Sequence, residues 1–335
     1  MTFKWNKSDY PEKKNIKVFS TFACGGGSTM GYKLAGLDVI GANDVDPKME
    51  RIYKLNHDPR HYFLCDIRDL KDKDLPEELF NLDILDGSPP CTTFSMAGKR
   101  DKSWGKSKKY AEGAVNQTLD DLYFRFLELA DTLQPKIIVS ENVKGLVQGR
   151  AKNYWKSILK KFNDIGYDTQ TFVLNSATMG VPQRRERVFI IGRRKDLKLP
   201  TLNLQFNEKP IIFGRFRSEK GKEPTDHAKK LLLYYQPQDK CLSHISERLF
   251  DKISGFNAMI VKDDDVYPTI TATGPNYRAF DKMECSSKDY ITAGSFPQDY
   301  DFDGVNVKYV IGMSVPPIMV QKIAEQIEKQ WFKPR

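Results

Sequence analysis

Residues 17–36 read KVFSTFACGGGSTMGYKLAG, a short apolar run followed by three glycines and then a helix-like stretch. Five more apolar runs follow up to residue 192, separated by longer amphipathic stretches: DVIGAN, LDILDG, KIIVSEN, TFVLN and RVFIIG. This alternation predicts an α/β fold, a mostly parallel twisted sheet with helices on both faces. Ligands of such sheets bind outside the carboxyl ends of the strands. The residues that end these runs are therefore the candidates for a functional site.

The glycine-rich turn contains Gly25, Gly26 and Gly27. Glycines let the backbone approach a nucleotide-like ligand, because a β-carbon would clash or forbid positive φ. A tight connection without a ligand explains such a turn equally well. The stretch has neither GxxxxGK[ST] nor a regular GxGxxG, so it favours a cofactor without a pyrophosphate over ATP or NAD.

Two acidic residues follow later apolar runs. Asp44 ends the second run, where an acid accepts hydrogen bonds from a ribose diol. A cap for the helix-like stretch PKMERIYKLN is an equally good interpretation of Asp44. Asp66 in CDIRD is placed to take an adenine amino group, with Ile67 against the ring, although a purely structural role is the commoner one for such a residue.

The stretch LDILDGSPPCTTFSMAGKR carries Cys91 directly after Pro89 and Pro90, at the end of a buried-looking strand. The prolines fix the backbone that presents the thiol, and a thiolate is the strongest nucleophile among the side chains near neutral pH. A basic loop with glycines follows. This context indicates a catalytic nucleophile, whereas a cysteine that only fills the core needs none of it.

The stretch KIIVSENVKGL ends a strand in Glu141 and Asn142, where a parallel neighbour of the Cys91 strand would end. A carboxyl group beside a thiol nucleophile suits an aromatic nitrogen heterocycle. When the carboxyl group donates to a ring nitrogen as sulfur adds, the adjacent carbon becomes electrophilic. Pairing with a nearby Arg or Lys is the alternative role for Glu141.

The stretch MGVPQRRERVFIIGRR places Arg184, Arg185 and Arg187 at the start of a strand. Alternation along the strand predicts Arg185 and Arg187 on the same face, where their guanidinium groups would hold Glu141, a phosphate or a base oxygen. A solvated cluster of edge charges is the alternative.

The chain carries 53 Lys and Arg against 44 Asp and Glu, a net charge of +9, which favours a polyanionic partner. Six basic residues and two acidic ones lie between Phe94 and Gln117, a stretch with three glycines that suits phosphate contact and closure. Disorder is the competing interpretation of that stretch.

Five cysteines without a CxxC pair and four histidines predict neither a disulfide framework nor a metal site. No apolar run is long enough for a membrane span or a secretion signal. We therefore expect a soluble, cytoplasmic protein that does not bind a membrane.

The combination of GSPPCTTFS, ENV, QRRER and a late Gly-x-Ser-Val strongly resembles the cytosine-5 DNA methyltransferases, over residues 16–192 and 267–330. The resemblance implies a Rossmann-like methyltransferase domain that uses S-adenosylmethionine and no metal. It also implies that a cytosine is flipped out of the duplex for reaction. Cys91 would add to carbon 6 of the cytosine and Glu141 would serve ring nitrogen 3, assisted by Asn142, Arg185 and Arg187.

The same resemblance implies a set of cofactor-binding residues and a set of DNA contacts. The implied cofactor residues are Phe22, Ala23, Gly25, Gly26, Asp44, Val45, Asp66, Ile67, Pro90, Leu122, Ser314 and Val315. The predicted DNA contacts are Ser95, Lys99, Arg100, Arg215 and Arg217.

Some positions differ from the usual family pattern. Ser20 stands where an acid often precedes the glycine-rich turn, and Cys24 stands where the first glycine is common. Met313 replaces a usual Asn, and Asp289 and Thr292 replace Glu and Arg. These differences concern cofactor contacts and the target-domain scaffold, not the predicted nucleophile.

We expect a catalytic and cofactor-binding domain at residues 1–199 and a target-recognition domain at 200–275, rich in basic and aromatic residues. Residues 276–335 would end in a helix over 315–330 that returns to the catalytic domain. The expected protein is a bacterial or phage-encoded monomer that methylates duplex DNA near the nucleoid, with a cognate restriction endonuclease as functional partner. The alternatives are a transfer-RNA cytosine-5 methyltransferase and a catalytically weak DNA-binding relative. An NAD-dependent dehydrogenase would leave Cys91 without a role.

Overall fold

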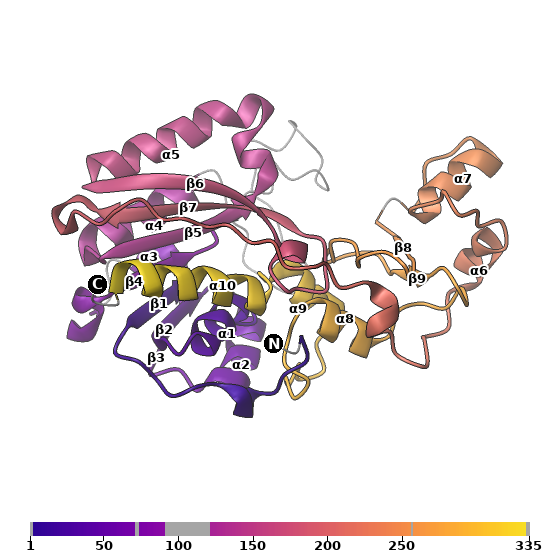
Figure 1. Cartoon of the computed structure of the whole chain (residues 1–335), viewed down its shortest axis with the longest axis horizontal. Coiled ribbons are helices and arrows are strands. Elements are labelled where there is room, and N and C mark those ends of the chain that lie inside the picture. Colours follow the sequence, from indigo (N-terminus) through magenta and orange to yellow (C-terminus); the bar gives the residue numbers. More distant parts are fainter. Residues whose placement is uncertain (1–2, 71–73, 91–120, 256, 333–335) are drawn as a thin grey trace. The chain divides into compact units, whose positions relative to one another are not determined.

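The computed structural model describes residues 3–70, 74–90, 121–255 and 257–332 (Figure 1). The chain forms two compact units. Unit 1 contains Met1–Asp9, Asn175–Arg185 and Phe206–Met319. Unit 2 contains Tyr10–Leu174, Glu186–Gln205 and Val320–Arg335. The functional boundaries at residues 199 and 275 stay a prediction.

Unit 2 is built on a seven-stranded sheet in the order β3-β2-β1-β4-β5-β7-β6. The strands are β1 (Lys17–Thr21), β2 (Asp38–Asp44), β3 (His61–Leu64), β4 (Ile84–Gly87), β5 (Ile137–Val143), β6 (Tyr167–Asn175) and β7 (Glu186–Arg194). The pairs β1–β2, β2–β3, β1–β4 and β4–β5 are parallel, and β7 runs antiparallel to β5. The predicted mostly parallel sheet is confirmed.

The strand order reverses direction along the chain between β1 and β4, which is where open α/β sheets form their ligand crevice. Consecutive residues of the central strands, such as Ile84 and Leu85, are fully buried, because helices cover both faces. The helices of this part are α1 (Gly27–Leu34), α2 (Pro47–His57), α3 (Ile67–Leu70), α4 (Leu122–Leu133), α5 (Lys152–Asp164) and α10 (Pro317–Ile327).

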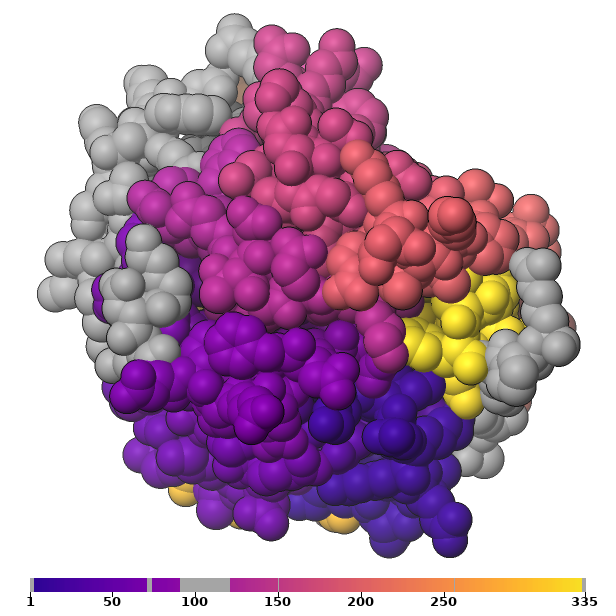
Figure 2. Space-filling view, turned by 90° about the vertical axis from the view of Figure 1, so that its left-hand side faces the viewer, coloured from indigo at the N-terminus to yellow at the C-terminus, as the bar shows by residue number. Residues whose placement is uncertain are grey.

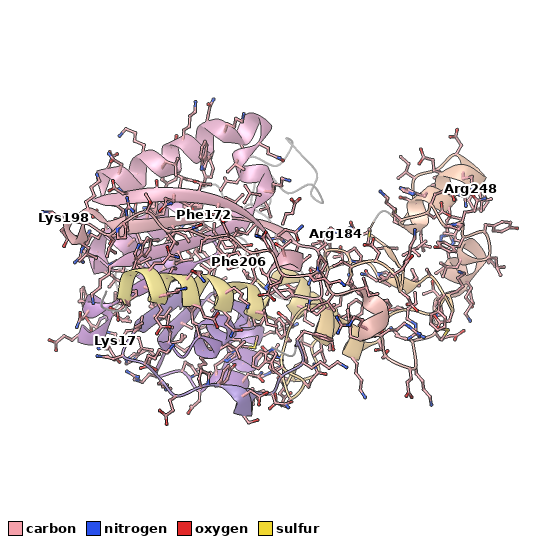
Figure 3. The ribbon with its side chains drawn as sticks, viewed as in Figure 1. Lys17, Phe172, Arg184, Lys198, Phe206 and Arg248 are labelled. Atoms are coloured by element: carbon pink, nitrogen blue, oxygen red, sulfur yellow. The ribbon has the colours of Figure 1, made fainter. Side chains whose placement is uncertain are left out.

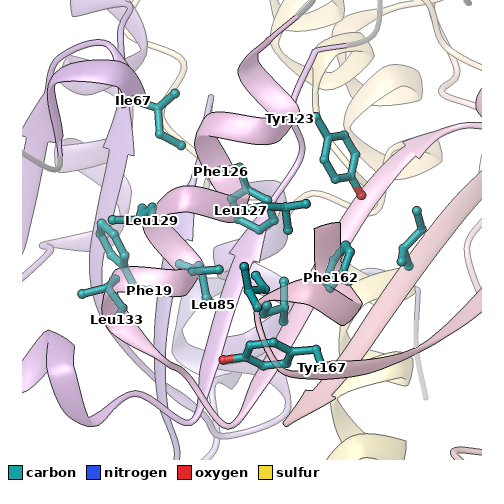
Figure 4. Close-up of a cluster of buried hydrophobic side chains, with 14 of the residues drawn as sticks. Phe19, Ile67, Leu85, Tyr123, Phe126, Leu127, Leu129, Leu133, Phe162 and Tyr167 are labelled. Carbon is teal, nitrogen blue, oxygen red and sulfur yellow. The ribbon is translucent and has the colours of Figure 1, made fainter. Parts of the chain in front are cut away.

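One apolar cluster fills the space between the sheet and the helices α4 and α5. Figure 4 shows side chains of α4 lying against those of the strands and of α5. Phe19 of β1, Leu85 of β4 and Phe126 of α4 are fully buried there. Burying each contributes about 1.5–3 kcal/mol. This packing fixes the strand ends that carry the candidate site.

The predicted C-terminal helix is α10, whose first residue is the second of two prolines, as suits a helix start. It is the yellow helix drawn over the strands of the sheet in Figure 1. The chain after it contacts two other segments of unit 2, because Glu328 pairs with Lys14 at 2.7 Å and Gln330 bonds with the backbone of Asn203. Figure 2 shows this yellow segment between the indigo N-terminal residues and the salmon stretch near residue 200.

Unit 1 has a small core of its own, built around Leu231, Ile245 and Tyr277. In the same unit, Arg248, which Figure 3 labels, pairs with the buried Asp239 at 2.7 Å. Its helices and strands are α6 (Asp226–Leu232), α7 (Leu242–Phe250), β8 (Ile260–Val261), β9 (Tyr277–Arg278), α8 (Ser287–Ala293) and α9 (Val307–Met313).

The first residues of the chain also belong to unit 1. The buried indole of Trp5 donates to the backbone oxygen of Ser295 at 2.9 Å, and the backbone oxygen of Trp5 accepts from Gln298 at 2.8 Å. The backbone amide of Lys7 donates to the carboxylate of Asp299 at 2.9 Å. These bonds fasten residues 5–7 to the segment that follows α8.

Candidate active site

The glycine-rich turn between β1 and α1 has an unusual backbone. Phe22, Cys24 and Gly26 all have positive φ, at 53°, 47° and 80°. Phe22 and Cys24 are not glycine, and a left-handed conformation costs such residues about 1–3 kcal/mol each. Residues held in this way cluster at ligand sites. The turn therefore has a shape that the surrounding structure must enforce, with Ala23 and Gly25 buried in it.

Gly26 is required by close packing as well as by its backbone. A β-carbon there would lie 2.1 Å from the Nε2 atom of His57. The His57 ring is buried, packs on Tyr53 with 4.5 Å between ring centroids, and places Nε2 3.3 Å from the backbone oxygen of Gly25. The His57 ring therefore packs directly against the turn, and Tyr53 packs on that ring.

We expect Gly26→Ala to destabilise the protein by more than the roughly 1–3 kcal/mol of backbone strain, because the new methyl group clashes with His57. Gly166→Ala is the matched control, since Gly166 has a φ of 95° and no atom lies within 4 Å of the position that its β-carbon would take. Denaturant unfolding of both variants measures the difference. Equal losses of stability would show that the His57 contact does not constrain the turn.

Asp44 holds the other side of the turn. Its Oδ2 accepts from the backbone amide of Cys24 at 2.7 Å, and its Oδ1 accepts from Val45 at 2.8 Å and Asp46 at 3.0 Å. Burial raises the pKa of Asp44, and the three amide bonds oppose that shift. The cap of α2 is Asp46, which accepts from the amide of Lys48, so the interpretation of Asp44 as the helix cap is wrong.

Asp66 lies just after β3 and bonds to Arg68. Its Oδ1 accepts from the Arg68 amide at 2.9 Å, and its Oδ2 pairs with the Arg68 guanidinium at 2.8 Å. Arg68 also pairs with Asp121, the residue before α4. Ile67 and Leu122 are buried in the apolar cluster. Arg68 thus connects two candidate cofactor segments, a link that no sequence motif predicts.

The residues at these strand ends fit the predicted cofactor. The strands β3, β2 and β1 are neighbours, so Asp66, Asp44 and Phe22 follow adjacent carboxyl ends. Carboxylates accept from hydroxyl and amino groups, and the half-buried Phe22 and the buried Ile67 offer apolar surface for a ring. Half-buried Val45 directly follows Asp44, and half-buried Pro90 lies three residues after the end of β4, the other neighbour of β1. This combination of side chains suits a nucleoside.

Glu141 and Asn142 end β5, which is the parallel neighbour of β4, as predicted. The Glu141 carboxylate pairs with Arg187 of β7, with 2.9 Å between Oε1 and Nε. Both side chains are largely buried. Burial lowers the pKa of Arg187, and Glu141 opposes that shift. The pair fixes the orientation of the Glu141 carboxyl group.

Asn142 acts on the backbone that leads to Cys91. Its Nδ2 donates to the backbone oxygen of Pro89 at 3.0 Å, and its Oδ1 accepts from the Val143 amide at 2.9 Å. The chain leaving β4 is therefore bonded to the end of β5 two residues before the predicted nucleophile. Cys91, Ser95, Lys99 and Arg100 lie outside the described residues.

Arg185 and Arg187 have different partners. Arg185 is buried in unit 1 and donates to the backbone oxygens of Ile270 at 2.9 Å and Gly312 at 3.1 Å. Arg187 belongs to unit 2, and its placement on the same face as Arg185 stays a prediction. Ser314, buried after α9, donates through Oγ to the backbone of Val310, and Val315 is buried beside it in sequence.

The two arginines predicted to contact DNA bases also differ. Arg215 is exposed at the end of a short 3-10 helix, Phe213–Arg215. The Arg217 guanidinium lies 3.9 Å from the centre of the Phe280 ring, and its Nε is 3.2 Å from the Asp263 carboxylate.

Asp289, one of the residues that differ from the usual family pattern, forms the capping box of α8 with Ser286.

Asp86 is a buried carboxylate that none of the sequence motifs marks as functional. It lies in β4 and bonds to Ser20 of β1 and Tyr32 of α1. An acidic residue inside the buried run LDILDG was the available signal. Its partner Ser20 follows from the strand register and its partner Tyr32 from the packing of α1, neither of which the sequence shows.

The chain is similar to Type II methyltransferases of bacteria. It is 34% identical over 184 residues to M.NgoPII of Neisseria gonorrhoeae, a match that covers 55% of this chain and 50% of that protein. It is 28% identical over 348 residues to M.Sau96I of Staphylococcus aureus, covering 96% of this chain and 77% of that protein. The first curated relatives are thus matched over about half of their length.

A solved structure of a prophage-encoded protein of Escherichia coli has the same fold. It superposes with a TM-score of 0.70 at 18% identity, covering 95% of this chain and all of that one. The sequence profile described as C-5 cytosine-specific DNA methylase matches residues 16–329. The strand order, the glycine-rich turn and the paired Glu141 lie within that match, and the chain therefore belongs to the C-5 cytosine-specific DNA methylase family.

Proposed function

We propose that this protein is a DNA (cytosine-5-)-methyltransferase that uses S-adenosylmethionine to methylate a cytosine within a short specific sequence. The supporting observation is the pair of neighbours at the end of β5. Glu141 is oriented by Arg187, while Asn142 holds the backbone two residues before Cys91. Glu141 and the backbone of Pro89, two residues before Cys91 in the sequence, thus follow neighbouring strands.

In the proposed reaction, the Cys91 thiolate forms a bond to carbon 6 of a flipped-out cytosine. In its protonated form, Glu141 donates a hydrogen bond to ring nitrogen 3, which stabilises the charge that moves into the ring. When bound, S-adenosylmethionine supplies the methyl group that carbon 5 takes up. Loss of the carbon-5 proton to a base then restores the ring as the bond between carbon 6 and sulfur breaks.

The cofactor would be held by the strand ends of unit 2. Asp44 would accept from one ribose hydroxyl and Asp66 from the adenine amino group, with Phe22 and Ile67 against the ring. Asp44 keeps acceptor capacity for this, because a carboxylate has about four lone-pair positions and the bonds to the three backbone amides leave one over. The remaining family-implied residues, Ser314 and Val315 among them, belong to the same proposal.

The proposed partner is double-stranded DNA, bound by a monomer and attracted by the net charge of +9. A bacterial cytoplasmic setting and a cognate restriction endonuclease complete the proposal, in line with the Type II methyltransferases that the chain resembles. Among the described residues, the structure has no helix that is both long and apolar enough to cross a bilayer.

The proposal is tested by bisulfite sequencing of DNA and of transfer RNA from cells that express the protein. We expect methylcytosine at one short DNA sequence and none above background in transfer RNA. A synthetic duplex with 5-fluorocytosine at that position should then form an adduct that survives denaturation, because fluorine cannot leave as a proton does. Methylation of transfer RNA alone would overturn the DNA assignment, and an active enzyme without an adduct would overturn the Cys91 mechanism.

Arg215 is the better candidate for reading a base, because Arg217 already pairs with Asp263 and stacks on Phe280. We expect Arg215→Ala to cost roughly 1–3 kcal/mol of discrimination at one base pair. Methylation rates on duplexes with single base-pair changes measure this cost. Arg217→Ala is the matched variant, and a relaxed preference in it with unchanged preference in Arg215→Ala would contradict the assignment.

A further inference from the structure

Asp86 carries a carboxyl group at a buried position, where an unpaired charge would be costly. It is 3% exposed within β4, five residues before Cys91. The register of the parallel pair β1–β4 places it directly opposite Ser20. Ser20 is the position at which the family often carries an acid. The carboxylate of Asp86 therefore lies opposite the position where the family often has an acid, on β4 instead of β1.

The contacts of Asp86 reach both sides of the glycine-rich turn. Its Oδ2 accepts from the hydroxyl of Ser20 at 2.8 Å, and Ser20 lies in β1 just before the turn. Its Oδ1 accepts from the hydroxyl of Tyr32 at 3.0 Å, and Tyr32 lies in α1, the helix that follows the turn. The backbone oxygen of Asp86 accepts from Thr21 at 3.0 Å. One residue thus bonds to the two elements that the turn connects.

Hydrogen bonds to a carboxylate stabilise a fold more than hydrogen bonds between neutral groups do. A hydrogen bond to a charged group contributes roughly twice as much as one between neutral groups. The turn contains the strained Phe22 and Cys24, so its shape needs external support. Asp44 and His57 supply support from the α2 side, through the Cys24 amide and the packing under Gly26. Asp86 supplies it from the β4 side.

We propose that Asp86 is a positioning residue of the cofactor site, which sets the shape of the turn from Phe22 to Gly26 by tying β1 and α1 to β4. It replaces the acid that is missing at Ser20. The functional part of this proposal rests on the proposed use of S-adenosylmethionine. The structural part, control of the turn by Asp86, does not.

The surroundings of Asp86 give this role a pH dependence. Burial raises the pKa of Asp86 to about 7, the hydroxyls of Ser20, Tyr32 and Ser28 oppose the shift, and the charge of Glu141 adds to it. Among the described residues, the charge of Asp86 also acts on Tyr53 of α2, whose hydroxyl bonds to Thr29, and Glu141 itself pairs with Arg187. The ionised carboxylate accepts from both hydroxyls, whereas the protonated form must use one oxygen as a donor. The turn is therefore held best above pH 7.

The first test is binding of S-adenosylhomocysteine to the full chain by calorimetry. We expect Asp86→Ser to weaken binding at pH 8 by about tenfold or more, as the loss of hydrogen bonds to a charged group predicts. The exchange variant Ser20→Asp/Asp86→Ser should bind within about threefold of wild type. Binding by wild type should tighten from pH 6 to pH 8, and the profile of Asp86→Asn should be flat. A flat wild-type profile, or an exchange variant as weak as Asp86→Ser, would overturn the proposal.

A milder variant covers the case in which Asp86→Ser does not fold. Tyr32→Phe removes a single hydroxyl that lowers the pKa of Asp86, so the midpoint of the binding profile should move to higher pH. Tyr53→Phe is the matched control, because its hydroxyl bonds to Thr29 and not to Asp86. Equal midpoints in Tyr32→Phe and wild type would contradict the proposal.

Hydrogen exchange separates this inference from the proposed function. In Asp86→Ser, or in Tyr32→Phe if needed, the amides of Cys24 to Gly27 should exchange at least about tenfold faster without any ligand, and the exchange variant should restore protection. Unchanged exchange overturns the positioning role of Asp86. If exchange responds as expected while wild type binds no S-adenosylhomocysteine, the proposed function fails and the control of the turn by Asp86 stands.

Discussion

Replacing Cys91 by serine is expected to reduce methyl transfer by at least about 10³-fold, which is the largest effect of any single change in this chain. An alcohol has far less anionic character near neutral pH than a thiol, so the bond to carbon 6 would form only very slowly. Binding of S-adenosylhomocysteine should stay close to that of wild type, because no residue proposed to hold the cofactor is changed.

Single-turnover methylation of a duplex with the mapped site measures this effect, together with the adduct on 5-fluorocytosine. The matched control is Cys241→Ala, at a buried cysteine just before α7 of unit 1 whose Sγ lies 3.0 Å from the Ser243 hydroxyl. The control should still form the adduct. Turnover of Cys91→Ser within tenfold of wild type would remove Cys91 from the role of nucleophile.

Arg187→Met is expected to damage both stability and catalysis. The Glu141 carboxylate pairs with Arg187 in a largely buried setting, and breaking such a pair leaves a buried charge unpaired at a cost of about 3–5 kcal/mol. Methyl transfer should fall because Glu141 loses the contact that orients it toward the base. Arg184→Met is the matched control, since its pair with Asp265 is half exposed and worth about 0–1 kcal/mol.

A second variant separates the two effects of Arg187. In Arg187→Met/Glu141→Gln the unpaired charge is gone, so unfolding in denaturant should show most of the lost stability restored. Methyl transfer should remain slow, because the oriented acid is missing. Glu141→Gln alone should slow transfer less than Cys91→Ser does, since an amide still donates a hydrogen bond. Recovery of activity in the double variant would show that the pair serves stability only.

The sequence predicted the parts of the fold that depend on local pattern. The apolar runs became strands, and the run before Cys91 lies beside the run that ends in Glu141, because parallel neighbours of this kind follow from the alternation of strands and helices. The proline pair before residue 318 marked the start of α10. The spacing of apolar residues and the residues of the turns predict these features.

The partners of buried polar groups could not be predicted in the same way. Whether Asp44 or Asp46 caps α2 depends on backbone geometry over two residues, and the sequence allowed both. The bond of Asp86 to Ser20 depends on the register between β1 and β4, and its bond to Tyr32 depends on how α1 packs against β4. The family resemblance named positions that carry chemistry, but it could not name residues such as Asp86 and His57 that support them.

The division of the chain between the two units bears on the order in which the protein can be made. The chain passes from one unit to the other after residues 9, 174, 185, 205 and 319. Trp5 is synthesised long before its partner Ser295, and residues 320–332 of unit 2 follow later still. Neither unit can reach its final contacts during translation until most of the chain has left the ribosome. Folding of this protein therefore finishes only after almost the whole chain has been synthesised, and a chain whose synthesis stops early contains two incomplete units instead of one finished domain.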